Sequence, residues 1–216
     1  MNRPILHGLT AVSLALGACA SAPVHYHTLL PVLENRTTAG QPPSGFAIDV
    51  LAVGIPAQLD QPQLVVRQGP TGVAVLDGER WAGPLGEEVR NALSAELVHR
   101  LQTRDVAGLA KPANKPVLRL KVQIRRLDAW PGSKVSLDAD WALGFAGEAA
   151  DARLVCSGQF EAAAAGGYPE LVLGQQRLVA ALAERIAADA RNWERSRAAA
   201  CSGNGAATKD AGPAAG

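Results

Sequence analysis

Few side chains in this sequence have the types and spacing that catalysis requires. Asp138 and Asp140 are two residues apart, so on a strand their carboxyl groups lie on one face, as a general acid–base pair needs. Covalent hydrolysis also needs a nucleophile beside a base, and the sequence has neither a Gly-x-Ser-x-Gly motif nor a Cys/His arrangement. We therefore expect both aspartates to pair with Arg119, Lys121 or Arg153 of neighbouring strands, and we predict no catalytic residue and no enzymatic activity.

Metal, cofactor and nucleic-acid sites are not indicated either. His25 and His27 alternate along a short predicted strand, and neither these two nor His99 has a third ligand at a useful spacing. The sequence has no Gly-x-x-x-x-Gly-Lys motif, so nucleotide hydrolysis must belong to a partner. The 216 residues carry a formal net charge of +1 and only 4% aromatic side chains, which argues against contacts to nucleic-acid phosphates and bases.

Residues 1–18 have the pattern of a bacterial secretion signal. Arg3 is their only charged residue, and an apolar stretch ends in small residues just before Cys19. That stretch is shorter than the ~20 residues of a permanent membrane-spanning helix. Leu16-Gly17-Ala18-Cys19 resembles the lipobox of bacterial lipoproteins, which implies cleavage before Cys19 and acylation of its thiol and of the new amino terminus.

Acylation at Cys19 would determine the compartment. Each buried methylene contributes ~0.8 kcal/mol, so three acyl chains form an anchor that does not dissociate on biological timescales. Residue 20 is alanine, whereas lipoproteins kept in the inner membrane often carry aspartate there, so the resemblance implies the outer membrane, on its periplasmic side. We predict a signal peptide over residues 1–18 and an acylated linker over residues 19–23.

Cys156 and Cys201 are the remaining cysteines of the mature chain. In an oxidising compartment two such thiols either form a disulfide or remain buried as free thiols. Cys156 lies on the predicted apolar face of a strand, so both alternatives stay open. A bond would close a loop of 45 residues and would join the end of the last helix to the sheet.

Two helices and a series of strands account for the region between residues 24 and 201. Apolar residues recur every four positions after Pro84, and a second stripe follows Tyr168-Pro169; both patterns predict amphipathic helices. The second stripe leaves Asp189 on its polar flank. Three strands with strict alternation lie between the helices, near residues 118–125, 135–145 and 153–161.

These elements predict an α+β two-layer sandwich, in which one largely antiparallel sheet packs against two amphipathic helices. Basic residues of the first of the three strands should face the acidic residues of the second. Additional short strands precede the first helix, including a hairpin around residues 68–72. Residues 202–216 are small, polar and rich in glycine and alanine, which predicts a disordered tail.

Several motifs of the predicted domain resemble the PqiC-type ABC-transport auxiliary lipoproteins. The most specific is Leu59-Asp60-x-Pro62-Gln63-Leu64-Val65-x-Arg67, and others are Tyr26-x-Thr28-Leu29, Val53-x-Ile55-Pro56, Glu79-x-Trp81-Ala82-x-Pro84-Leu85, Arg125-Arg126-Leu127 and Tyr168-Pro169. The resemblance covers nearly the whole mature domain. The sequence departs from the family in its long Gly/Ala-rich tail and in the pair Cys156 and Cys201.

The resemblance implies an outer-membrane lipoprotein that docks the periplasmic end of a mammalian-cell-entry (MCE) domain protein anchored in the inner membrane. Together the two proteins would form a conduit for phospholipid and support envelope integrity. One sandwich of this size cannot enclose a lipid channel, so we expect a homo-oligomer. Arg67, Arg80 and Trp81 are candidates for the partner or assembly interface because Trp and Arg are enriched in binding hot spots; the alternative is that Trp81 packs into the core and the arginines are solvated.

A second hypothesis is a stand-alone periplasmic lipoprotein that binds a small hydrophobic or envelope ligand. It requires a closed pocket between the sheet and the helices.

Overall fold

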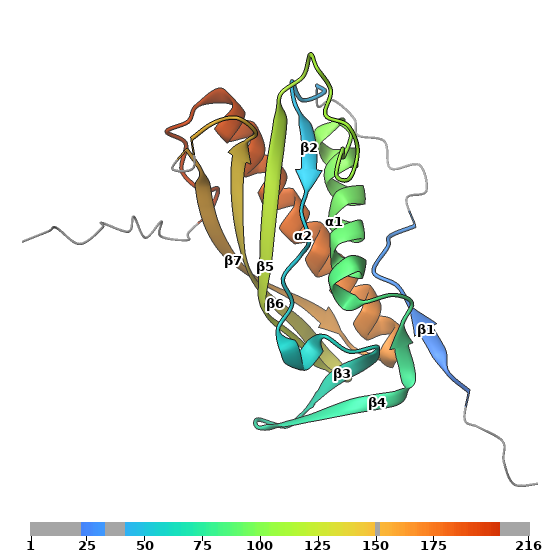
Figure 1. Cartoon of the computed structure of the whole chain (residues 1–216). Helices are drawn as coiled ribbons and strands as arrows, with labels where there is room; N and C mark the ends of the chain where they lie inside the picture. Colours follow the sequence, from blue (N-terminus) through green and yellow to red (C-terminus); the bar gives the residue numbers. More distant parts are fainter. Residues whose placement is uncertain (1–22, 33–41, 150–151, 204–216) are drawn as a thin grey trace, which may run out of the picture.

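Two helices pack on one face of the larger of two sheets in the computed structural model, which describes residues 23–32, 42–149 and 152–203 (Figure 1). The predicted signal peptide, Cys19 and most of the predicted tail lie outside the described residues. The elements in chain order are β1 (His25–His27), β2 (Ala47–Val50), the short 3-10 helix η1 (Ala57–Leu59), β3 (Gln63–Gln68), β4 (Gly72–Trp81), α1 (Leu85–Leu101), β5 (Val117–Trp130), β6 (Ser133–Phe145), β7 (Leu154–Ala164) and α2 (Tyr168–Arg195).

The larger sheet has the strand order β2-β5-β6-β7. β5, β6 and β7 form the predicted antiparallel meander, and β2 adds to β5 in parallel. Apolar side chains of β6 point to the helices, while its acidic side chains face solvent and bind β5: Arg125 Nε lies 2.6 Å from Asp140 Oδ2, and Arg126 Nε lies 3.1 Å from Asp138 Oδ2. The expected pairing of basic and acidic strands is confirmed. The partners of the aspartates are Arg125 and Arg126 instead of the predicted Arg119, Lys121 or Arg153.

The core lies between this sheet and the two helices. The predicted stripe of α1 is buried along its whole length, at Leu85, Val89, Leu93, Leu97 and Leu101. α2 crosses the same face of the sheet beside α1 (Figure 1) and contributes Leu178, Leu182 and Ile186. Trp141, from the middle of β6, fills the centre. The α+β class with helices packed on sheets is therefore confirmed.

A second, three-stranded sheet with the order β1-β4-β3 is separate from the first, whereas the sequence predicted a single sheet. The reason lies in the connection after β2, where Pro56 and Pro62 bracket η1. Proline lacks the backbone N–H that a ladder requires, so the chain leaves the larger sheet before the β3–β4 hairpin begins. The hairpin extends from one end of the molecule, opposite the loop that joins α1 to β5 (Figure 1).

Candidate functional site

A bidentate ion pair joins the hairpin to the end of β5. Arg67 of β3 donates from Nε to Asp128 Oδ1 at 2.8 Å and from Nη2 to Asp128 Oδ2 at 3.2 Å. Arg67 is about a quarter exposed and Asp128 is mostly buried, so solvent screens the pair only in part. Arg67 therefore holds the projecting hairpin in a defined position.

Beside this ion pair lies an open groove of about 280 Å³ between the hairpin and β5. We call it the hairpin groove. Its apolar wall includes Leu59, Val65 and Val73, and its polar side includes Arg125 and Arg126. Val73 is 56% exposed, which is unusual for a valine on a strand. Apolar residues beside salt-bridged arginines resemble the composition of protein–protein interfaces.

The three candidate interface residues do not form one cluster. Trp81 is only 5% exposed and packs in the core, and its backbone N–H donates to the carbonyl of Pro62. Arg67 is directed to Asp128. Arg80 is half-buried on β4, donates from Nε to the carbonyl of Asp77 at 3.4 Å, and lies opposite Tyr26 of β1. Trp81 therefore supports the junction of β4 with α1, and only the arginines reach the surface.

Two histidines of β1 converge on one carboxylate of β4. His25 Nδ1 lies 3.0 Å from Glu79 Oε1, and His27 Nε2 lies 2.5 Å from Glu79 Oε2. Burial raises the pKa of Glu79, but hydrogen bonds from His27 and His25 and their positive charges oppose it, and the net pKa lies below its ordinary value of 4.5. The histidines thus fasten β1 to β4 through hydrogen bonds to Glu79.

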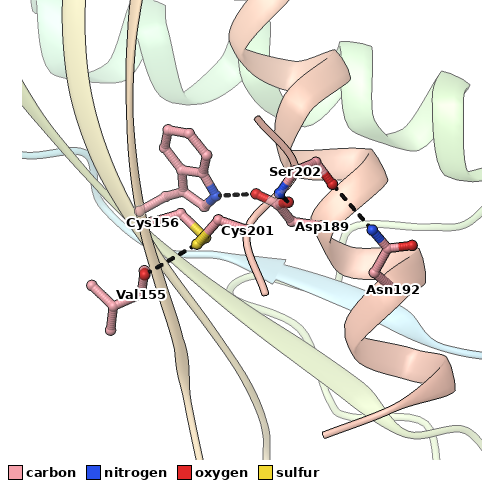
Figure 2. Close-up of a disulfide and its surroundings, with 7 residues drawn as sticks. Val155, Cys156, Asp189, Asn192, Cys201 and Ser202 are labelled. Atoms are coloured by element: carbon pink, nitrogen blue, oxygen red, sulfur yellow. Dashed lines mark hydrogen bonds between the residues drawn. A yellow bond between two sulfur atoms is a disulfide. The ribbon is translucent and has the colours of Figure 1, made fainter. Parts of the chain in front are cut away.

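A disulfide joins Cys156 of β7 to Cys201, beyond α2, with the sulfur atoms 1.97 Å apart (Figure 2). The next residue, Ser202, donates its backbone N–H to Asp189 Oδ1 of α2 at 2.5 Å, and Asn192 Nδ2 donates to Ser202 Oγ at 3.1 Å. The chain after α2 therefore returns to the edge of the sheet and is held there by one covalent bond and two hydrogen bonds.

Asp189 differs from the sequence prediction, which placed it on the polar flank of α2. It is fully buried, and its Oδ2 accepts the indole N–H of Trp141 at 2.9 Å. A buried tryptophan needs a hydrogen-bond acceptor, so the position of Trp141 in the middle of an apolar strand face was the available signal. Asp189 is the residue at which β6, α2 and the C-terminal segment meet.

Glu88 of α1 lies off the apolar stripe that follows Pro84, yet it is buried. Its Oε2 accepts hydrogen bonds from Thr28 Oγ1 at 2.7 Å and from the backbone N–H of Leu29 at 2.9 Å. A carboxylate in the first turn of a helix is favoured by the helix dipole. Glu88 therefore anchors the segment after β1 to the start of α1.

Side chains fill the space between the larger sheet and the helices. Trp141, Leu93 and Leu182, which belong to one hydrophobic core cluster, are all at most 2% exposed. In the described ranges, no three His, Cys, Asp or Glu side chains have metal-binding geometry. Over the same part of the chain, neither α1 nor α2 combines the length and the apolar character that crossing a bilayer demands.

The comparisons with known proteins agree with this architecture. One crystal structure of an uncharacterized protein is 20% identical, with a TM-score of 0.61 over 78% of this chain and 99% of the other. A Xanthomonas campestris protein of the family DUF330 is 14% identical, with a TM-score of 0.57 over 81% of this chain and all of the other. No curated protein matches the sequence.

The family model described as "ABC-type transport auxiliary lipoprotein component" matches residues 27–187. The match begins at the last residue of β1 and ends in α2, so it includes strands β2 to β7, all of α1 and most of α2. The chain therefore belongs to the family of ABC-type transport auxiliary lipoprotein components.

Proposed function

We propose that this chain is an outer-membrane lipoprotein subunit of an MCE-type intermembrane lipid transport system. It docks the periplasmic end of an inner-membrane-anchored MCE protein and supports phospholipid transfer and envelope integrity. The observation that carries the proposal is the order of two features: a lipobox-like Leu16–Cys19 stands directly before a domain that matches the auxiliary lipoprotein family from residue 27.

The proposed membrane anchor is Cys19, the last residue of the lipobox-like motif. The acyl chains would supply the membrane attachment. Ala20, in place of an aspartate, favours delivery to the outer membrane. The folded domain then faces the periplasm, which is the compartment in which the Cys156–Cys201 disulfide is stable.

The hairpin groove is the surface that we assign to the MCE partner. It combines the exposed Val73 with arginines that are already paired, so a partner can bury apolar area without desolvating an unpaired charge. The domain core is filled, so a lipid passage has to form between copies of the chain or with the partner, and we infer a homo-oligomer. No catalytic step is assigned to this subunit; nucleotide hydrolysis belongs to the transporter.

Copurification of the acylated protein with the MCE protein from the same cell tests this assignment. Val73→Glu places a charge in the hairpin groove and should abolish copurification, whereas Leu109→Glu, at a 69% exposed position in the loop at the other end of the molecule, should not. The size of the purified protein should exceed that of one chain. A strict monomer that retains no MCE protein would contradict the proposal.

The alternative, a stand-alone lipoprotein that binds a small ligand, needs an enclosed pocket between sheet and helices. The filled core gives it no support.

A further inference from the structure

The start of the described chain lies next to β4. Gly78 of β4 has no side chain, and a Cβ placed there would lie 3.5 Å from the carbonyl oxygen of Pro23. The N-terminal segment therefore runs along β4 before it enters β1. In Figure 1, β1 begins at the same end of the molecule as the β3–β4 hairpin. A membrane anchor that precedes Pro23 would therefore hold this end of the domain close to the membrane.

The distance from Pro23 to the acylated residue is limited by chain length. Only residues 20–22 separate Cys19 from Pro23, and four steps of a fully extended chain span about 14 Å. The headgroup layer of a bilayer occupies about 6 Å on each side of the hydrocarbon. With the acyl chains in the hydrocarbon, β1 and the adjoining part of β4 cannot lie far above the lipid headgroups.

The two faces of β1 are chemically different. His25 and His27 point to one side, where they bind Glu79. Tyr26 points to the other side and is 67% exposed, and Val24 just before the strand is exposed as well. Tyr26 is in register with Arg80 of the parallel neighbour β4, and residues in register on neighbouring strands point to the same face. Tyr26 and Arg80 therefore lie side by side.

We propose that Tyr26 and Arg80, with Val24, form a membrane-contact patch that rests on the phospholipid headgroups beside the Cys19 anchor. The inference depends on the acylation included in the proposed function. A tyrosine ring is well suited to the boundary between water and hydrocarbon, and a guanidinium binds lipid phosphate. The patch gives the domain a fixed orientation on the membrane: β1 and the hairpin lie nearest the membrane, and the α1–β5 loop points into the periplasm. In this orientation the MCE partner has to extend to the outer-membrane side of the domain to reach the hairpin groove.

Fluorescence quenching by brominated lipids in vesicles of phosphatidylethanolamine and phosphatidylglycerol tests the patch. Tyr26→Cys of the full acylated chain is labelled with an environment-sensitive dye under non-reducing conditions, and Leu109→Cys is the matched control at the far end. Wild-type protein treated with the same dye gives the background. Both positions are exposed, so the label does not disturb packing. We expect a blue shift and quenching at position 26, neither at position 109, and loss of quenching at position 26 when Arg80→Gln is added.

Vesicle flotation separates the two proposals. If the protein floats but the dye at position 26 is not quenched, the patch is wrong and the anchor stands. If aqueous iodide does not quench the dye at position 26 and the brominated lipids do not quench it either, then protein covers this position. That result also overturns the patch. Failure to float overturns both the anchor and the patch.

Discussion

Replacing Cys201 by serine removes the disulfide and should weaken the attachment of the C-terminal segment to the sheet. The bond closes a loop between positions 45 residues apart. Chain entropy for a loop of this length corresponds to about 4 kcal/mol, which is an upper value because the unfolded chain retains some structure. Cys201 is the better site because it is partly exposed, whereas a change at the buried Cys156 would also alter packing against the core.

Urea unfolding at equilibrium measures this effect. Oxidised wild-type protein should unfold at a clearly higher urea concentration than Cys201→Ser, and a reductant should lower the wild-type midpoint to that of the variant. The variant itself is the control, because the same reductant should leave its midpoint unchanged. Alkylation followed by mass measurement should label neither Cys156 nor Cys201 in the native oxidised protein.

Two results would refute this reasoning. Complete labelling of both thiols without reductant would mean that no bond forms. A midpoint that does not respond to reductant, in a protein shown to be oxidised, would mean that the C-terminal segment contributes nothing to stability although Ser202 and Asn192 hold it to α2.

Two further predictions concern hydrogen-bonded carboxylates, the buried Asp189 and the partly buried Glu79. Asp189→Ala leaves the N–H groups of Trp141 and Ser202 without their acceptor and should reduce the free energy of unfolding by about 2–4 kcal/mol. Asp189→Asn keeps one acceptor oxygen and should cost about half as much in the same urea assay. An alanine variant as stable as the wild type would contradict the buried network. The pKa of Glu79 is lowered in the folded state, so its contribution to stability is present above pH 4.5 and is lost as the pH falls through the folded-state pKa. In unfolding curves measured below pH 4.5, Glu79→Gln should therefore lose less stability than the wild type. Equal losses of stability in the variant and the wild type would show that the histidine contacts do not matter.

The local elements could be predicted because their patterns depend only on neighbouring residues. The four-residue stripe from Leu85 to Leu101 specifies one face of a helix, and the alternation in β6 specifies one face of a strand. The pairing of the basic face of β5 with the acidic face of β6 followed from the same alternation, whereas the register, with its shift between Ile124 and Arg126, decides which arginines bind the aspartates. Recognition of the family rested on motifs within single loops and strand ends.

Long-range features could not be predicted in the same way. Asp189 and Glu88 occupy polar positions by local pattern, and only the approach of Trp141 or Leu29 from distant segments makes them buried acceptors. The third strand of the smaller sheet comes from the addition of β1 to β4, a parallel pairing between strands more than 50 residues apart. The pairing of Arg67 with Asp128, 61 residues away, and the burial of Trp81 likewise follow from tertiary packing.

The central claim, that this chain is an acylated envelope lipoprotein, is tested most directly by growing cells with labelled palmitate and isolating the protein. We predict that the label appears on the wild-type chain, that it is absent from Cys19→Ala, and that the labelled chain lacks residues 1–18. A full-length, unlabelled chain in the cytosol would contradict it.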